Sequence, residues 1–458
     1  MLDYNKAIII LGVSYLFTLF YFYIKTCKNK WNINIFIILT LLITPYNILI
    51  TRISDTNKLE IINFLYRIKI YKLSLMDILL ITYFLYFTIK NLKELKIKND
   101  VIVIYFIRDI IFLIITTCSY IYFKGYFLDN GIRYINGIRN YIYFYISFFL
   151  SYFFYKKNKN FNYLEFIKNW FIFSVILSFL FKREDLWIRY GYRVIILSQE
   201  WIIVLQFLIS ILIFKLLLKN RHYLNILFLS LILLFNFSKI SIVWLLCLGI
   251  FYLLFYKKLN KTRLLCYCVI SFLICFLLTY IFTIKLKNDI ALNTRLLQVE
   301  QLIKDMKNRD KLTYGILFGS GMGTPYKGEM GDTGESRAID RERFGNYKFD
   351  IQTPIFSLWK DIGVIGIIIM YIFNIVLLKI ILNKKKVEFL NTDDKAEYYS
   401  IIYFLAFNLV FLQNYFNTPL LSSFNGLLIA KFSLLREKVV KNKFKGRKNG
   451  NALFLDKK

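Results

Sequence analysis

Long apolar runs follow one another along most of the chain, separated by short stretches rich in lysine. Runs such as Ile102–Ile107 and Ile242–Leu248 are continuous and do not alternate with polar positions, which favours buried or membrane-spanning helices over half-exposed strands. Because a helix needs about 20 apolar residues to cross a bilayer, the pattern predicts an all-α, polytopic transmembrane helical bundle of about 12–13 spans. We place them near residues 7–24, 32–50, 73–89, 101–123, 139–155, 166–181, 194–218, 223–237, 240–256, 264–284, 354–381, 398–414 and 419–435.

Composition and charge agree with this pattern. Hydrophobic residues make up 57% of the 458, and 61 Lys and Arg against 29 Asp and Glu give a formal charge of +32. In a soluble protein such a balance would suggest nucleic acid, but here the charges lie between the apolar runs, as membrane topology demands. The composition therefore excludes an ordinary soluble enzyme, and we expect no nucleic-acid partner.

The distribution of positive charge predicts which loops face the cytoplasm. The lysine-rich loops and the C-terminal tail should lie inside, which leaves one long loop outside. The predicted organisation is N-terminal transmembrane helices (1–284), a long extracytoplasmic loop (285–353), C-terminal transmembrane helices (354–435) and a basic cytoplasmic tail (436–458).

Arginine is concentrated in the loops that face outward. Arg binds phosphate through a planar fork of donors, so outward arginines suggest an anionic ligand such as a lipid pyrophosphate. Contact with lipid headgroups is the alternative, and it stays open. The candidate ligand-binding arginines include Arg133, Arg139, Arg189, Arg193 and Arg295.

A few polar residues interrupt or border the apolar runs and are candidates for structure or chemistry. Arg108 and Asp109 are adjacent, and neighbours in sequence do not face each other on a helix, so we expect each to find another partner in a structural ion pair. Glu200 follows the Arg189–Arg193 stretch closely, where it could orient an arginine or act as a base. Lys239 lies between two spans, as a topology signal or as part of a site.

The long outer loop holds an amphipathic helix and a glycine-rich turn. Apolar residues recur at helical spacing over residues 288–310. Gly319, Gly321 and Gly323 then alternate with other residues, which permits tight turns and close approach to a ligand. The turn is not a Walker loop, because no Gly-Lys-Ser/Thr follows at the required spacing.

The order of these features resembles that of the O-antigen polymerase and O-antigen ligase group of bacterial membrane glycosyltransferases. The resemblance covers the chain from about residue 189 to its end and is carried by short motifs in sequence order: Arg189-x-Gly191, Ser238-Lys239, Arg295, Leu317–Gly323 and Gly363-x-x-Gly366. The ligases typically have a His-Asn pair eleven residues before the first glycine of the last motif, where this chain has Gln352 and Thr353. That departure favours the polymerases, with the ligases as an alternative.

The resemblance implies an enzyme of the bacterial cytoplasmic membrane. It would join lipid-linked oligosaccharide units into a surface polysaccharide, O-antigen or capsule, by glycosyl transfer on the outer face, with no metal or other cofactor. The donor would be a glycan on undecaprenyl pyrophosphate and the acceptor a sugar hydroxyl on a second lipid-linked unit. Membrane lipids and a chain-length regulator protein would be its other partners.

Candidate roles can be placed on individual residues. Arg189, Arg193 and Arg295 suit the departing pyrophosphate, whose growing charge they would offset, and Lys239 and the three glycines would add substrate contacts. The base that accepts the hydroxyl proton would be one of three carboxylates, those of Asp350, Glu200 and Glu335. Gln352 would hydrogen-bond a sugar or phosphate oxygen.

Other classes of protein fit the sequence less well. A flippase for lipid-linked oligosaccharide would need cationic groups at mid-membrane and would commonly show two similar halves, whereas the basic groups here lie in loops and no internal repeat is visible. Another glycosyltransferase type has an acidic pair in its first outer loop, and here Asp55 and Glu60 are not adjacent. A structural assembly protein is a further alternative.

Replacing Arg295 with Ala tests the proposed anion contact. We expect loss of long polymer at an unchanged protein level, because the departing pyrophosphate would lose a charge-stabilising donor. Gel analysis of surface glycan, with immunoblotting of the protein, measures both quantities. A normal chain-length distribution would exclude this role for Arg295.

Overall fold

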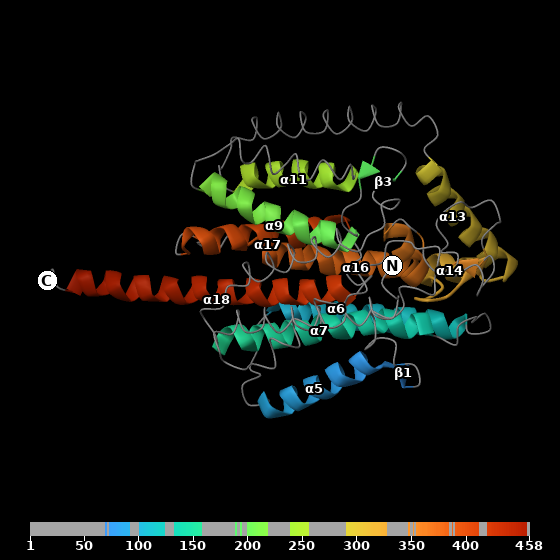
Figure 1. Ribbon diagram of the computed structural model, residues 1–458, viewed down its shortest axis with the longest axis horizontal. Helices are drawn as coiled ribbons and strands as arrows, with labels where there is room; N and C mark the ends of the chain where they lie inside the picture. The colour runs from blue at the N-terminus through green and yellow to red at the C-terminus, as the bar shows by residue number, and fades with distance from the viewer. Residues whose placement is uncertain are drawn as a thin grey trace, which may run out of the picture. The chain divides into compact units, whose positions relative to one another are not determined.

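The computed structural model describes residues 69–70, 73–91, 100–123, 132–157, 188–189, 193–194, 199–218, 239–255, 290–327, 347–348, 351, 354–383, 387, 390–411 and 419–455 (Figure 1). Ten helices account for 89% of these described residues. The all-α prediction is confirmed at this level. Within the described residues, the helical stretches Asp100–Tyr122 and Ile355–Ile381 are long and apolar enough to cross a membrane.

The helices follow the predicted apolar runs closely. Five predicted spans, 7–24, 32–50, 166–181, 223–237 and 264–284, lie outside the described residues. The amphipathic helix predicted at 288–310 is present as α13. The bounds are α5 (Leu75–Asn91), α6 (Asp100–Tyr122), α7 (Ile132–Lys157), α9 (Gln199–Leu218), α11 (Lys239–Phe255), α13 (Ile290–Asn308), α14 (Leu312–Phe318), α16 (Pro354–Ile381), α17 (Thr392–Phe411) and α18 (Pro419–Leu455).

Six short strands pair into three antiparallel hairpins within the described residues. They are β1 (Lys69–Ile70) with β2 (Leu73–Ser74), β3 (Ile188–Arg189) with β4 (Arg193–Val194), and β5 (Tyr326–Lys327) with β6 (Tyr347–Lys348). The chain divides into two compact units. The first comprises Met1–Trp170, Thr294–Ile380 and Leu412–Leu434, and the second comprises Phe171–Asn293, Ile381–Phe411 and Leu435–Lys458.

In the first unit, α6 and α16 point apolar residues outward and polar residues inward. Between their end turns, where Asp100 and Lys379 are exposed, the exposed large side chains of the two helices are apolar or aromatic, as at Ile114 and Ile368. The buried residues of the same helices include Asp109, Lys360 and Asn374. This is the reverse of the pattern in a water-soluble helix and is typical of helices in a bilayer, where charged groups turn to the bundle interior.

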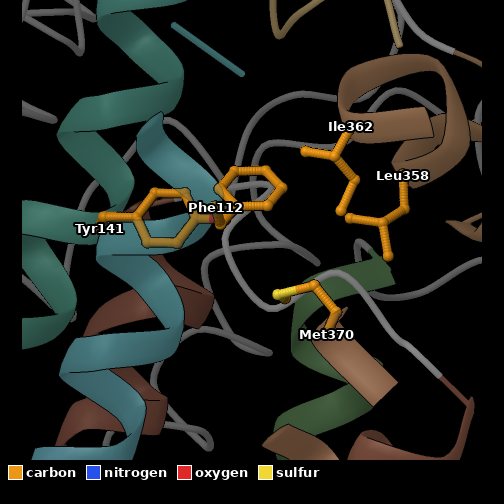
Figure 2. Close-up of a cluster of buried hydrophobic side chains, with 5 residues drawn as sticks. All are labelled: Phe112, Tyr141, Leu358, Ile362 and Met370. Carbon is orange, nitrogen blue, oxygen red and sulfur yellow. The ribbon is translucent and has the colours of Figure 1, made fainter. Parts of the chain in front are cut away.

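An aromatic and aliphatic cluster packs α6 and α7 against α16. Figure 2 shows the rings of Phe112 and Tyr141 beside each other, with Leu358, Ile362 and Met370 of α16 facing them. The two rings stack with their centroids 5.3 Å apart. Because aromatic pairs contribute beyond the area they bury, this cluster fixes the spacing of the three helices.

A buried ion pair lies in the same three helices. The guanidinium of Arg108 donates to Asp109 Oδ1 through Nε at 2.9 Å and Nη2 at 2.8 Å. Nη1 donates to Asn374 Oδ1 at 3.2 Å, and Tyr145 Oη donates to the other oxygen of Asp109 at 2.7 Å. The prediction that each residue has a further partner is therefore confirmed, and the structural role stays a prediction. The two neighbours also pair with each other, which we did not expect, because the long arginine side chain folds back along the helix.

The beginning of α18 packs closely on α7 through small residues. A Cβ atom on Gly426 would lie 2.3 Å from the carbonyl oxygen of Phe144, so only glycine fits this contact. Ser147 Oγ donates to the carbonyl of Ser423 at 2.6 Å. Small residues of this kind let helix backbones approach within a membrane.

The second unit is built on α9, α11 and α17. The edge of the Trp244 indole meets the Tyr403 ring at 5.0 Å, and Tyr403 Oη donates to the Trp244 carbonyl. Lys215 pairs with Asp393 at 3.0 Å, which joins the end of α9 to the first turn of α17. The basic segment after residue 435 continues the helix α18 without interruption.

Replacing Asp109 with Leu should destabilise the bundle by about 3–5 kcal/mol, because the buried Arg108 guanidinium loses its counter-charge. The double replacement of Arg108 and Asp109 by Leu should recover most of that loss, since no unpaired charge then remains buried. Unfolding of the detergent-solubilised protein measures both effects. A single and a double variant of equal stability would show that the pair does not act as a unit.

Candidate functional site

The glycine-rich turn links α14 to β5 and has a backbone that only glycine adopts readily. Gly319, Gly321 and Gly323 have φ angles of 79°, 89° and 77°, in the left-handed region where a Cβ atom is disfavoured. The three glycines were predicted from sequence as a turn, and the turn is present.

The first glycine packs directly on the backbone of α16. A Cβ atom on Gly319 would lie 2.6 Å from the carbonyl carbon of Asp361 and from the amide nitrogen of Ile362. The opposite contact is equally close, since a Cβ atom on Gly363 would lie 2.3 Å from the carbonyl of Leu317. Gly363 itself has φ 65° and interrupts the helical geometry of α16. The turn and the helix therefore meet backbone to backbone.

The middle of the turn packs on the end of α6. A Cβ atom on Gly321 would lie 2.5 Å from the amide nitrogen of Tyr120. The amide of Met322 donates to Thr116 Oγ1 at 2.6 Å. Ser119 Oγ donates to the carbonyl of Phe318 at 2.8 Å. These short contacts tie the turn to the last two turns of α6.

Met322 connects the turn to the core below it. Its side chain packs on the cluster in Figure 2 and fills the space beside Gly137 of α7, where a Cβ atom would lie 2.2 Å from the sulfur. An unbranched, polarisable side chain suits such an irregular gap. The turn therefore contacts α6, α7 and α16 together.

A buried lysine completes the attachment to α16. The Lys360 side chain is fully buried, and its ammonium donates to Asp361 Oδ1 at 2.9 Å and to the Gly321 carbonyl at 3.4 Å. The Ser320 amide donates to the Lys360 carbonyl at 2.6 Å. Trp359 Nε1 donates to the Ile316 carbonyl at 3.2 Å. A buried charge is tolerated only when it is paired in this way.

These contacts account for Gly319 and Gly321 through protein packing alone. Gly319 and Gly321 approach protein backbone, where the sequence suggested close approach to a ligand. A ligand-binding role for the three glycines stays a prediction. The observed effect of the turn is to hold α14 in a fixed position at the ends of α6 and α16.

A surface cavity of about 540 Å³ lies beside the turn. It combines basic side chains with aromatic ones. Its lining residues are Tyr122 of α6, Lys307 of α13, Asp310 and Lys311 of the connection, and Leu312, Thr313, Tyr314, Leu317 and Phe318 of α14.

The aromatic wall of the cavity is well ordered by its own contacts. Tyr122 and Tyr314 stack with centroids 4.0 Å apart, and Phe318 lies 5.1 Å from Tyr314. The Lys311 ammonium lies 4.3 Å above the Tyr122 ring and donates to the Tyr122 carbonyl at 2.7 Å. Aromatic faces with lysine beside them suit a ligand that has both a sugar-like apolar face and negative charge.

The inner face of α13 is polar and lies beside β5. Arg309 Nη2 pairs with Asp305 Oδ2 at 2.7 Å and also donates to the Pro325 carbonyl at 3.3 Å. Burial raises the pKa of Asp305, while the Arg309 guanidinium opposes that rise. A carboxyl group with a raised pKa outside the apolar helices is a candidate for proton transfer.

The predicted arginines of the first unit have different positions. Arg139 of α7 lies 3.8 Å from the carboxylate of Asp77 in α5, and its guanidinium faces the Tyr143 ring at 5.9 Å. Arg133 lies near the start of α7 and Arg295 in the first half of α13. Arg139 therefore has a structural contact, and anion binding by all three stays a prediction.

Four further predicted residues belong to the second unit. Arg189 and Arg193 face each other across the β3–β4 hairpin. Glu200 lies in the first turn of α9, and Lys239 begins α11. The remaining predicted residues lie outside the described part of the chain: Glu335, Asp350 and Gln352.

Sequence reasoning missed the residues of the cavity and of the inner face of α13. Tyr122 and Tyr314 are far apart in sequence, so no motif could pair them. Gln301 and Asp305 of α13 and Arg309, which directly follows its last residue, recur at intervals of four, and that spacing places them on one face. This spacing could have identified the polar face from the sequence, but the prediction of the helix was based on its apolar residues.

Comparison of the chain with models of known protein families, with curated proteins and with solved structures finds no match.

Replacing Gly363 with Ala should detach the turn from α16, because the new Cβ atom would overlap the Leu317 carbonyl and the φ of 65° disfavours alanine. We expect a clear loss of thermal stability and faster proteolysis in the connection after α13. Gly249 of α11 is the matched control, since nothing lies within 4 Å of its added Cβ atom. Equal behaviour of the two variants would show that the contact at Gly363 is not tight.

Proposed function

We propose that the protein is a membrane enzyme that polymerises lipid-linked oligosaccharide units into a surface polysaccharide on the outer face of the bacterial cytoplasmic membrane. The reaction is a glycosyl transfer. The acceptor hydroxyl attacks the anomeric carbon of the donor glycan, and the bond between that carbon and the pyrophosphate oxygen breaks. Undecaprenyl pyrophosphate leaves with the electron pair, and a carboxylate takes the hydroxyl proton.

Placement in a membrane is supported by the two long apolar helices and by their outward apolar faces. The paired charges of Arg108 and Asp109 lie inside the bundle, as they would in a bilayer. In water the exposed face of α6, which includes Ile114 and Ile121, would be an apolar patch of the kind that soluble proteins rarely expose.

The cavity beside α14 is the observation that carries the proposal. It lies at the end of a helix that is long enough to span the membrane, where a lipid-linked substrate would present its phosphate and first sugars. Lys307 and Lys311 would face the phosphate charge, and the stacked Tyr122 and Tyr314 would offer apolar surface to a sugar ring.

The glycine turn supports the proposal because it makes the cavity rigid. Transfer between two lipid-linked sugars requires the reacting atoms to be held in register. The turn fixes α14, one wall of the cavity, to α6 and α16 through backbone contacts. No metal-holding group of His, Cys, Asp and Glu occurs within the described residues.

A strain that lacks the gene tests the function directly. Surface glycan length is compared by gel with lipid-linked intermediates by mass spectrometry. Single units that reach the surface but are not joined would support a polymerase. Units trapped on the cytoplasmic side would indicate a flippase, and long polymer that remains on its lipid carrier would indicate a ligase.

Two pairs of variants in this strain test the cavity. Tyr314→Leu should shorten the polymer, whereas Tyr134→Leu should not, although Tyr134 also stacks on a tyrosine, with its ring centroid 4.2 Å from that of Tyr120.

Lys307→Gln should also shorten the polymer, and Lys304→Gln on the same helix is its control. Each expected loss is several-fold in chain length at equal protein level. Matched effects within both pairs would remove the cavity from the reaction.

A further inference from the structure

The inner face of α13 carries several polar side chains that are buried in the protein. Gln298 and Gln301 are each only 3% exposed, and the side chains of Asp305 and Arg309 are 12% and 8% exposed. Residues 301, 305 and 309 are spaced by four, so they form one stripe along the helix. Lys307, which lines the cavity, is on the other side of α13.

The polar groups at the C-terminal end of this stripe are paired within the protein. Asp305 and Arg309 form an ion pair at 2.7 Å, and Arg309 also donates to the Pro325 carbonyl at 3.3 Å. These contacts hold α13 against the segment that follows the glycine turn. Because α13 is held in this way, Gln301, one helical turn before Asp305, has a fixed position relative to that segment.

Gln301 differs from its neighbours on this face. In the described part of the chain, neither Nε2 nor Oε1 of its amide has a hydrogen-bond partner. Gln298 is equally buried but does interact with the protein. A buried amide without partners is strongly disfavoured, and most buried polar groups in proteins are paired. The amide of Gln301 is therefore best explained by a ligand that pairs with it.

We propose that Gln301 binds adjacent hydroxyl groups of a neutral sugar in the lipid-linked glycan, beside the Asp305–Arg309 pair. The amide oxygen accepts from one hydroxyl while the amide nitrogen donates to the next, which is the pattern that vicinal hydroxyls present. This inference rests on the proposed function and adds to it a sugar-binding residue outside the basic, aromatic cavity.

The required ligand chemistry follows from the amide. A phosphate offers only acceptors, so it would satisfy the nitrogen and leave the oxygen unpaired. A hydrocarbon chain would satisfy neither. A sugar with neighbouring hydroxyls satisfies both, and a deoxy sugar at the same position would be rejected because one amide atom would stay unpaired.

Replacement of Gln301 by Met tests the proposal with two readouts. Met has nearly the same length but no hydrogen-bonding group, so the variant removes two unpaired polar atoms from the interior. We expect an unchanged or higher unfolding temperature of the full-length protein in detergent. The probe for binding is the oligosaccharide released by mild acid from the lipid carrier of the same cells, and its affinity should fall about tenfold. Gln301→Leu serves as a second variant if the Met variant is not folded.

Gln298→Met is the matched control on the same helix. Because Gln298 interacts with the protein, its loss should lower the unfolding temperature and leave oligosaccharide affinity unchanged. If Gln301→Met lowers the unfolding temperature as much as Gln298→Met, the Gln301 amide has a protein partner and the inference is wrong. Unchanged affinity in Gln301→Met would overturn it as well.

The wild-type protein separates this inference from the proposed function. If the wild type binds the oligosaccharide and restores polymer in the deletion strain, while Gln301→Met does the same, only the role of Gln301 fails. If the wild type neither binds nor restores polymer, the proposed function fails, and this inference fails with it.

Discussion

The backbone contact between Gly319 and Gly363 is the constraint on which the attachment of α14 in the first unit depends. A Cβ atom on Gly319 would overlap the backbone of α16 from Asp361 to Gly363, and a Cβ atom on Gly363 would overlap the backbone at Leu317 and Phe318. The helix α16 gives up regular geometry at Gly363 to admit the turn. Through this contact, α14 and the end of α13 are attached to two long apolar helices.

The helices themselves depend on a second constraint, the pairing of charge inside an apolar bundle. Arg108 and Asp109 share hydrogen bonds with Asn374 and Tyr145, so three helices meet at one polar network. Lys360 and Asp361 repeat the arrangement near the turn. In low-dielectric surroundings a network of this kind fixes one arrangement, because every alternative leaves a charge unpaired.

Together the two constraints fix the connection between apolar runs that forms the proposed binding surface. The cavity and the inner face of α13 lie on opposite sides of the same helix. One side carries Lys307, which lines the cavity together with aromatic rings of α6 and α14, and the other carries the Gln301 amide and the Asp305–Arg309 pair. A lipid-linked glycan has a charged phosphate and neutral hydroxyls, so both chemistries are useful to one substrate. Their separation on a rigid helix would let phosphate and sugar be recognised independently.

Local patterns in the sequence were enough to predict the long helices, but not the short helix α14 (Leu312–Phe318), where no helix was predicted. Apolar runs and helical spacing predicted α6, α13 and α16 to within a few residues, because apolar length and periodicity are properties of consecutive residues. The glycine turn was predicted for the same reason. The charge pattern predicted that a polar connection would follow the apolar run that ends near residue 284.

Contacts between distant segments were decided only by the tertiary structure. The alternating glycines predicted that the turn approaches another group closely, but they did not predict that this group is the backbone of α16. The pairing of Tyr122 with Tyr314 and of Arg108 with Asn374 crosses long stretches of chain. Gln298 and Gln301 are equally polar and equally buried, and only the folded chain determines that the first has a partner while the amide of the second has none. Sequence alone determined the long helices, because apolar length and periodicity are local properties, and packing determined which of their buried polar groups have a partner.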